Sequence, residues 1–449
     1  MIWNHCWSPF PQDQREERRG ARLAFLWALY YLVVYAVGRN SPFNRQIIWI
    51  GVALLGLISV PFLSQHLRLS ALPREGVRLG LFLLWSMTGY FVATNEVGFV
   101  RYLQILTEFT AIVTALSLVF MYSGAVKWFH LAFLGVAVAA IYYIGHPISM
   151  EFVTPEDQIR TEIGTANGLG FSGVLGVFSA LALFPETKRL WVRGGIVAGG
   201  FLAFYAILLS ASRSAFLSLM VIAVLWPALC LISTRRFKLT ATIGAGIVLL
   251  LAYGAYGFIM QETYLGNRLM QSVNMEDGST RTRFELVRIG LGLFISNPLF
   301  GCGLGQFSIV SGTGHYAHNE FVEIAATTGL PGLLLYYSVY VIAWRRLSRA
   351  LGVLQDPLVR YRINLARVAL LVMVILGLVS TPNFLNKPSM FLLATIVGIA
   401  HWAERMARQV HGRAPAGPGM NAAQPGFSGW PRPPVPGGWP GVAGGWGRR

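Results

Sequence analysis

The chain has 449 residues, of which 54% are hydrophobic and only 12% are charged, with a mean hydropathy of +0.54. A soluble surface needs roughly a quarter of its residues charged, so this composition excludes a set of water-soluble domains. The formal net charge of +17 could indicate a nucleic-acid-binding protein. The basic residues, however, are scattered in short clusters between apolar runs, which is typical of a membrane protein, and no nucleic-acid partner is expected.

Apolar runs long enough to cross about 30 Å of hydrocarbon recur along the chain. The sequence therefore predicts an all-α integral membrane protein with about twelve transmembrane helices and membrane lipids as its surroundings. The predicted spans lie near residues 22–38, 46–63, 76–94, 102–121, 128–145, 166–184, 192–209, 214–232, 239–260, 331–343, 364–381 and 389–404. The span near 331–343 is short for a crossing and is expected to extend into its neighbours.

Residues 261–330 interrupt this pattern with a long polar, glycine-rich stretch. It contains helix-like pieces near 281–296 and 318–328, and His318 or Asn319 can cap the second piece, which should end at Gly329 before a proline. A long loop with its own secondary structure tends to carry function in a membrane protein.

The last segment, residues 412–449, is rich in Pro, Gly and Trp. It lacks the apolar content to form a core, so we expect a disordered extension after a membrane domain of residues 1–411.

The distribution of Lys and Arg predicts the orientation of the chain in the membrane. With a cytoplasmic N-terminus, the inside segments hold 20 of these residues and the outside segments hold 10. Both termini are therefore expected in the cytoplasm and the 261–330 loop on the opposite side. The three cysteines, Cys6, Cys230 and Cys302, are far apart and show no CxxC spacing, so neither a metal nor a redox site is indicated.

The helix predicted over 281–296 has two distinct faces. Arg281, Glu285 and Arg288 are spaced i, i+4 and i+7, which is typical of a solvated row of salt bridges. Arg283 falls instead in the apolar stripe of the same helix. An arginine in that position needs a buried anionic partner, a ligand or a cavity.

Two histidines, His315 and His318, stand three residues apart in the same loop. A metal would need a third ligand, and the nearby Glu320 and Glu323 do not project together with both histidines, so no metal site is predicted. His318 lies at the mouth of the helical bundle and shares its loop with Arg283. It is therefore a candidate functional residue.

The motifs occur in a specific order along the chain. Arg213 opens a span in SRSA, Arg283 precedes NPLFGCGLGQF, and His318 begins HNEF, which is followed by TGLPG. This order resembles the conserved core of the O-antigen ligase family, which also holds O-antigen polymerases and bacterial protein O-oligosaccharyltransferases. The resemblance covers roughly residues 160–345. Within it, RTEIGTANGLGF resembles an upstream segment of the family with Arg160 and Asn167 at the matching places, although the segment is shorter than usual, and Val287 replaces the common tryptophan.

The resemblance implies a helical bundle of the GT-C type in the bacterial inner membrane, with its active site in the periplasm. It implies metal-independent and cofactor-free transfer of a glycan from undecaprenyl pyrophosphate to an acceptor hydroxyl. Arg213 and Arg283 would bind the pyrophosphate and His318 would be the base. Arg160, Asn167 and Asn319 are further possible contacts to the substrate.

Two kinds of acceptor are open within the family. A ligase would use the lipid A core, and this is the leading interpretation, whereas a polymerase of O-antigen or exopolysaccharide would use the growing polysaccharide. A different class, a secondary transporter of anions, would also fit twelve spans. The sequence disfavours it because the two halves show no internal repeat and no pair of interrupted helices at matching positions.

Overall fold

The computed structural model describes residues 14–36, 44–66, 72–122, 126–145, 166–210, 212–233, 278–379 and 382–411, together with Met270. The regular elements of these ranges are helices. They are α1 (Gln14–Ala36), α2 (Asn44–His66), α3 (Arg74–Thr88), η4 (Gly89–Val92), α4 (Glu96–Tyr122), α5 (Val126–Gly145), α7 (Ala166–Leu183), η5 (Phe184–Glu186), α8 (Leu190–Ser210), α9 (Arg213–Ser233), α12 (Gly278–Ser296), α13 (Phe307–Val310), α14 (Glu320–Val353), α15 (Pro357–Gly377), η6 (Asn383–Leu385) and α16 (Lys387–His411).

The prediction of an all-α membrane protein is confirmed. In the described part of the chain, four helical segments are long and apolar enough to cross a membrane, namely Glu96–Met121, Gly168–Glu186, Leu190–Ser210 and Glu320–Val353. Helices also occupy the other predicted spans that the structure describes. The predicted span near 239–260 and the tail from 412 lie outside the described residues, and the total of about twelve spans stays a prediction.

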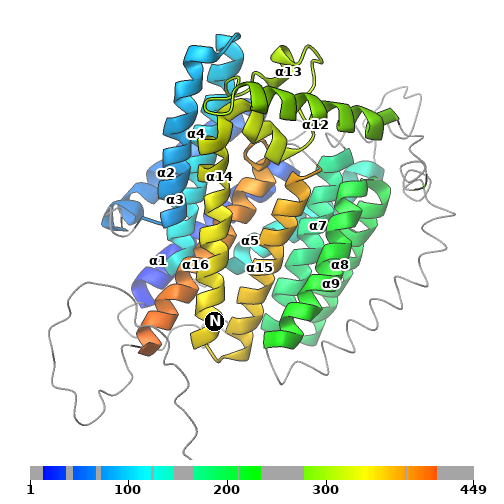
Figure 1. Ribbon diagram of the computed structural model, residues 1–449. Coiled ribbons are helices and arrows are strands. Elements are labelled where there is room, and N and C mark those ends of the chain that lie inside the picture. Colours follow the sequence, from blue (N-terminus) through cyan, green and yellow to red (C-terminus); the bar gives the residue numbers. More distant parts are fainter. Residues whose placement is uncertain are drawn as a thin grey trace, which may run out of the picture.

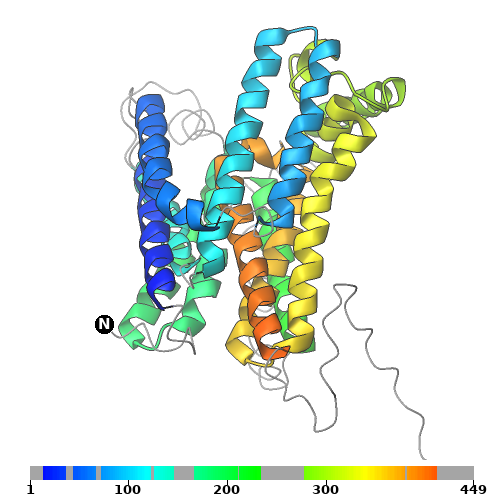
Figure 2. The same cartoon turned by 90° about the vertical axis from the view of Figure 1, so that its left-hand side faces the viewer.

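Most helices run side by side in one bundle (Figures 1 and 2). At one end, which we call the outer end, α12 crosses the bundle and α13 lies beside it, and α3 and α4 extend beyond the other helices there. The opposite end, which we call the inner end, carries the end of α14 and the start of α15 (Figure 1). The described part of the predicted 261–330 loop thus lies at the outer end.

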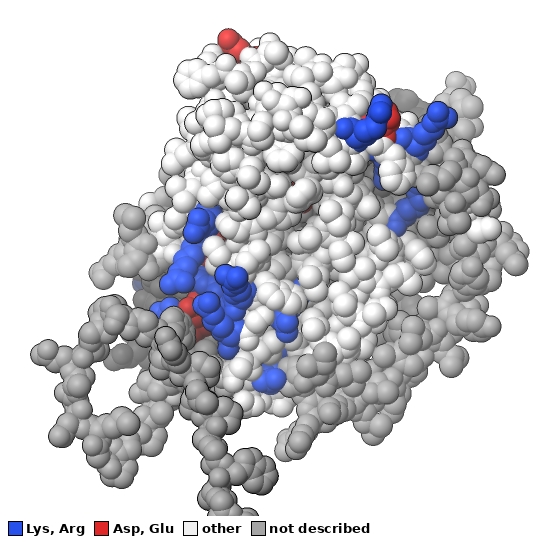
Figure 3. Space-filling view, viewed as in Figure 1, with Lys and Arg blue, Asp and Glu red and all other residues white. Residues whose placement is uncertain are grey.

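Charged side chains separate along the bundle axis. On the face shown in Figure 3, one group of basic side chains lies around the start of α12 and another lies toward the inner end, with a broad uncharged band between them. The inner end also holds a buried ion cluster. Arg346 donates to Glu75 at 2.8 Å, forms an ion pair with Glu404 at 2.8 Å and contacts His401. This cluster joins α3, α14 and α16. A buried charge without a partner would be strongly destabilising, so the cluster ties the three helices together.

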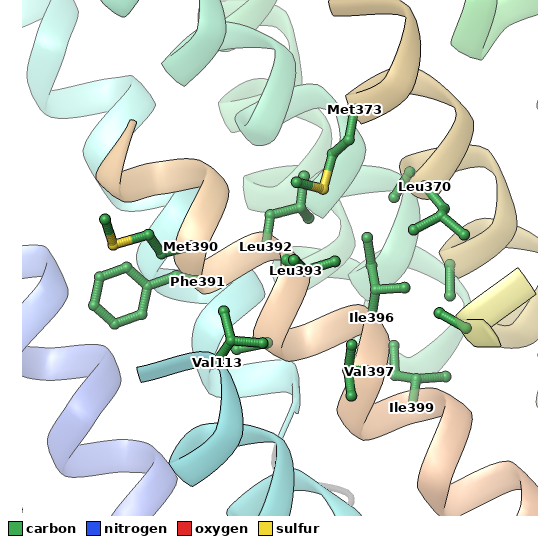
Figure 4. Packing of buried hydrophobic residues seen from close by; sticks show 14 of the residues in the cluster. Val113, Leu370, Met373, Met390, Phe391, Leu392, Leu393, Ile396, Val397 and Ile399 are labelled. Carbon is green, nitrogen blue, oxygen red and sulfur yellow. The ribbon is translucent and has the colours of Figure 1, made fainter. Parts of the chain in front are cut away.

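The core of the bundle surrounds α16, which packs against α4, α14 and α15. Met390, Leu393 and Val397 of α16 are fully buried, and side chains of α15 and α4, including Met373 and Val113, meet α16 (Figure 4). A helix that is apolar on several sides is typical of a position inside a bundle, with neighbours all round.

The predicted helix over 318–328 and the predicted span near 331–343 form one kinked element, α14. Asn319 caps it as expected, because its side-chain oxygen accepts the Val322 N–H at 3.1 Å. The chain does break at Gly329, where φ is 68° and ψ is −173°, but the helix resumes at once. A side chain at Gly329 would overlap the Leu299 carbonyl, so only glycine allows this close approach.

Cysteine labelling tests the predicted orientation. In a background without the natural cysteines, a cysteine at Ser311 should react with an impermeant maleimide in right-side-out membrane vesicles. A cysteine at the exposed Arg349, near the inner end of α14, should react only in inverted vesicles. Labelling of both positions in the same vesicle type would contradict the orientation and the periplasmic location of the loop.

Candidate active site

The two faces of α12 are as the sequence predicts. Leu286 and Gly290 are buried, and a side chain at Gly290 would overlap Val322 of α14, so glycine here allows the two helices to approach closely. On the opposite face Arg288 donates to Glu285 at 2.7 Å, and both side chains are exposed. Arg283 lies on the buried side and is itself only partly exposed.

The glycine turn that follows α12 is bonded to α14. The N–H groups of Cys302 and Gly303 donate to the Ala326 and Thr327 carbonyls at 2.8 and 3.1 Å. The buried Gln306 side chain accepts the Asn95 N–H at 2.8 Å and donates to the Asn95 carbonyl at 2.9 Å. The turn therefore fixes the end of α12 against both α14 and the connection before α4. Burial raises the pKa of the Cys302 thiol to about 12, so this cysteine is no nucleophile.

His318 occupies an unusual backbone conformation directly before the cap of α14. Its φ of 53° is positive, which is uncommon for a residue other than glycine and costs energy unless neighbours hold it. The buried Glu323 carboxylate accepts the Ala317 N–H at 2.6 Å. The Asn319 side chain donates to the Leu378 carbonyl at 3.0 Å, which ties the loop to the end of α15.

Arg283 and His318 meet at one cavity of about 170 Å³. Its walls are formed by Thr282, Arg283, Leu286, His315 and His318. Arg283 also donates to the Val379 carbonyl at 3.3 Å, so it spans from α12 to the segment that follows α15. The apolar stripe thus places an arginine at a cavity, which was one of the three settings predicted for it.

The other predicted site residues are not among the walls of this cavity. Arg213 is the first residue of α9 and is partly exposed, and Ser212 caps this helix by accepting the Ala215 N–H at 3.4 Å. Asn319 caps α14 next to the cavity. Arg160 lies outside the described residues, and so does the side chain of Asn167 in α7.

The electrostatics of the cavity favour a neutral histidine. Burial, Arg283 and His315 together lower the pKa of His318 to about 4, so its imidazole is neutral at pH 7. The ring of Tyr316 lies against it, with the ring centroids 4.1 Å apart. Burial raises the pKa of Tyr316, which therefore keeps its proton at pH 7.

The two carboxylates near the histidines are directed elsewhere. Glu320 is fully buried and accepts from the Tyr336 hydroxyl at 2.6 Å and from the Asn383 side chain at 2.9 Å. Glu323 accepts the Ala317 N–H. Across the described ranges, no three His, Cys, Asp or Glu residues form a group that could hold a metal.

Comparison with known families identifies the region that contains this cavity. The family model described as O-antigen ligase matches residues 198–337, which run from α8 into α14. This match supports the resemblance to the O-antigen ligase family that the motifs indicate. Arg213, Arg283, His318 and Asn319 fall inside the match, and Arg160 and Asn167 precede it. No curated protein matches the chain.

Members of the O-antigen ligase family are glycosyltransferase-like enzymes, either ligases or polymerases, that act on lipid-linked glycans. The matched domain in this chain combines membrane helices with the cavity at the outer end. The match and the membrane helices together support a membrane protein with a function of the ligase and polymerase type.

Sequence reasoning missed two residues of the site, Tyr316 and Glu323. Glu323 was considered only as a metal ligand, whereas the structure shows it as an anchor for the backbone before His318. A signal was present, because a carboxylate in the first turn of a capped helix often accepts an N–H from the residues just before the helix. No local pattern points to Tyr316.

We expect Glu323 to position His318. Glu323→Ala leaves the buried Ala317 N–H without its acceptor, and a buried donor that loses its partner costs about 1–3 kcal/mol. The turnover number should therefore fall by about 10- to 100-fold with little change in the KM for the donor. Glu323→Gln keeps an acceptor oxygen and should retain most activity, as should the exposed Glu285→Ala. Normal turnover per folded molecule in Glu323→Ala would contradict the positioning role.

Proposed function

We propose that the enzyme transfers a glycan from undecaprenyl pyrophosphate to an acceptor hydroxyl at the cavity between α12 and His318. The observation that carries this proposal is the presence of an arginine and a neutral histidine at one cavity inside the O-antigen ligase domain. The site would face the periplasm, and the enzyme would reside in the bacterial inner membrane with both termini in the cytoplasm.

Arginine suits the leaving group of this reaction. The pyrophosphate carries several negative charges, and a guanidinium can donate two parallel hydrogen bonds to phosphate oxygens, whereas lysine cannot. A charge pair about 4 Å apart is worth about 4 kcal/mol at an effective dielectric constant near 20, before desolvation. Arg283 lines the cavity and would provide such contacts, and Arg213 would provide the second cation.

The chemical step is a displacement at the anomeric carbon of the donor sugar. The acceptor oxygen forms a new bond to this carbon as the bond to the phosphate oxygen breaks, and undecaprenyl pyrophosphate leaves with the bonding electrons. The acceptor hydroxyl gives its proton to a ring nitrogen of His318. A base must be neutral to accept this proton, and the lowered pKa of His318 meets that condition at pH 7.

Positive charge at the cavity comes from arginine in this proposal, and the reaction would need neither metal nor cofactor. The contacts of the carboxylates support this, because Glu320 and Glu323 accept hydrogen bonds from Tyr336, Asn383 and Ala317, and do not face His315 and His318 as a pair of ligands. Transfer should therefore persist in chelator.

The acceptor that we propose is the sugar core of lipid A, which makes the enzyme an O-antigen ligase. The polymerase of O-antigen or exopolysaccharide uses the same donor and the same chemistry. Arg160, Asn167 and Asn319 are further candidates for contacts with the sugars.

A transfer assay tests the proposal. Purified enzyme in liposomes is supplied with an undecaprenyl-pyrophosphate-linked glycan and either a lipid A core acceptor or no second acceptor, with and without EDTA. A product joined to the lipid A core, formed equally in EDTA, is expected. Chains of repeating units joined to each other would identify a polymerase instead. No transfer to either acceptor, or transfer that returns only with added divalent metal, would overturn the mechanism.

A further inference from the structure

The exposed side of α12 divides into two edges of opposite character. Phe284, Leu291 and Ile295 are spaced i, i+7 and i+11, which places them along one edge, and they are 62%, 41% and 75% exposed. The neighbouring edge carries the exposed charged residues of the helix, Arg281, Glu285 and Arg288. A helix with an apolar edge beside a charged edge is typical of one that lies in a membrane interface.

The level of α12 along the bundle is fixed by its contact with α14. The Leu330 N–H donates to the Pro298 carbonyl at 2.8 Å, directly after the end of α12. Leu299 and Phe300 beside this contact are exposed, and so is Leu334, one turn further along α14, at 62%. An apolar exposed surface thus continues from α14 onto the end of α12.

The length of α14 indicates how far the hydrocarbon core of the membrane extends toward the outer end of the bundle. Arg345 and Arg349 are exposed basic residues near its inner end, and such residues mark the membrane boundary. From Arg345 to Leu330 a helix rises about 22 Å. The hydrocarbon core is about 30 Å thick, so it extends to Leu330 and past it, to the level of the end of α12.

We propose that α12 is an interfacial helix whose apolar edge, Phe284, Leu291 and Ile295, is embedded in the lipid of the outer leaflet. Transfer of a large apolar side chain from water into lipid is favourable, and three such side chains lie in one row on this edge. The uncharged band of Figure 3 continues up to the basic group at the start of α12, and Arg281 and Arg288 lie on the edge that would face water and headgroups.

This placement sets the depth of the cavity. Arg283 lies on the face of α12 opposite the charged edge, so an embedded α12 holds its guanidinium near the level of the lipid headgroups. If the proposed function is right, a lipid-linked pyrophosphate reaches Arg283 while its polyprenyl chain stays in the membrane. The interfacial position of α12 itself does not depend on that function.

Fluorescence quenching tests the proposal with neighbouring positions as matched controls. Ile295 and Ser296 are both exposed but lie on different edges of α12. In a background without the natural cysteines, Ile295→Cys and Ser296→Cys would be labelled with an environment-sensitive dye and reconstituted in liposomes of phosphatidylethanolamine and phosphatidylglycerol. One arm adds lipids with a doxyl group near the headgroup, and the other adds aqueous iodide.

The label at position 295 should be quenched several-fold more strongly by the doxyl lipid than the label at 296, and iodide should show the reverse order. Equal quenching at the two positions would overturn the proposal, as would iodide quenching of position 295. Protection of position 295 from both quenchers would also overturn it, because the occupant would then be a protein, such as a second copy of the chain. The readout needs no glycan transfer, so it can succeed or fail independently of the proposed function.

Discussion

His318→Ala should lower the rate of glycan transfer by about 10²–10⁴-fold, which is the usual contribution of a general base. A residual rate is expected because Arg283 and the rest of the cavity still bind the donor. The measurement is the initial rate of transfer in liposomes at saturating donor, with the amount of folded protein checked by size-exclusion chromatography.

His315 is the matched control for His318. It lines the same cavity and lies three residues away, but it has no proposed role in the proton transfer. His315→Ala should therefore keep most of the activity, and neither variant should gain activity with added zinc. If both variants lost activity equally and added metal restored it, the two histidines would be metal ligands. That result would contradict the assignment of His318 as the base.

The pH dependence follows from the lowered pKa of His318. Burial, Arg283 and His315 favour the neutral imidazole, so the active form persists from pH 7 downward and is lost as the pH falls through about 4. The acid limb of kcat/KM reports the free enzyme and should appear near that value. A bound anionic pyrophosphate favours the imidazolium, so the limb of kcat should lie at higher pH. An acid limb that is unchanged in His318→Ala would assign it to another group.

Arg283→Ala should lower transfer by about 10²–10³-fold, the typical cost of removing one preorganised group that stabilises developing charge. Arg283→Lys should also be poor. A lysine keeps the charge but cannot hold a phosphate with a planar fork while also reaching the Val379 carbonyl, as Arg283 does. Arg213→Ala is expected to have an effect of the same order if it supplies the second cation. The measurement is kcat and KM for the lipid-linked donor.

Arg281 and Arg288 provide the controls on the same helix. Both are exposed, and Arg288 is already paired with Glu285. Their replacement by alanine should leave most of the activity, since surface ion pairs contribute little. Similar losses at Arg281, Arg283 and Arg288 would show that the face of α12 does not distinguish them and that general positive charge is sufficient.

Much of the fold follows from local properties of the sequence. Apolar runs predicted the helices that the structure describes in the membrane region, and the polar interruption predicted α12 and the start of α14. Either His318 or Asn319 was expected as the cap of this helix, and Asn319 is the cap. These predictions hold because helix formation and capping depend on residues within a few positions of each other.

Only part of the candidate site could be predicted from local properties of the sequence. Helical periodicity separated Arg283 from Arg281 and Arg288, because the faces of one helix are set by its own 100° rotation per residue. The same periodicity could not show that α14 resumes directly after Gly329, since that depends on the space between Gly329 and the Leu299 carbonyl.

The sequence by itself determined that this is an all-α membrane protein with the ordered motifs of the O-antigen ligase family, and that Arg283 and His318 were the residues to examine. Only the tertiary structure decided that these two, 35 positions apart, share a cavity. It also decided that Arg283 donates to the Val379 carbonyl, which is 96 positions away, and that the Glu323 carboxylate accepts the Ala317 N–H. The physical reason is that apolar patterning fixes which face of a helix is buried. The close approach of α12 to α14 at Gly290, the glycine turn and the kink at Gly329 fix which buried groups meet.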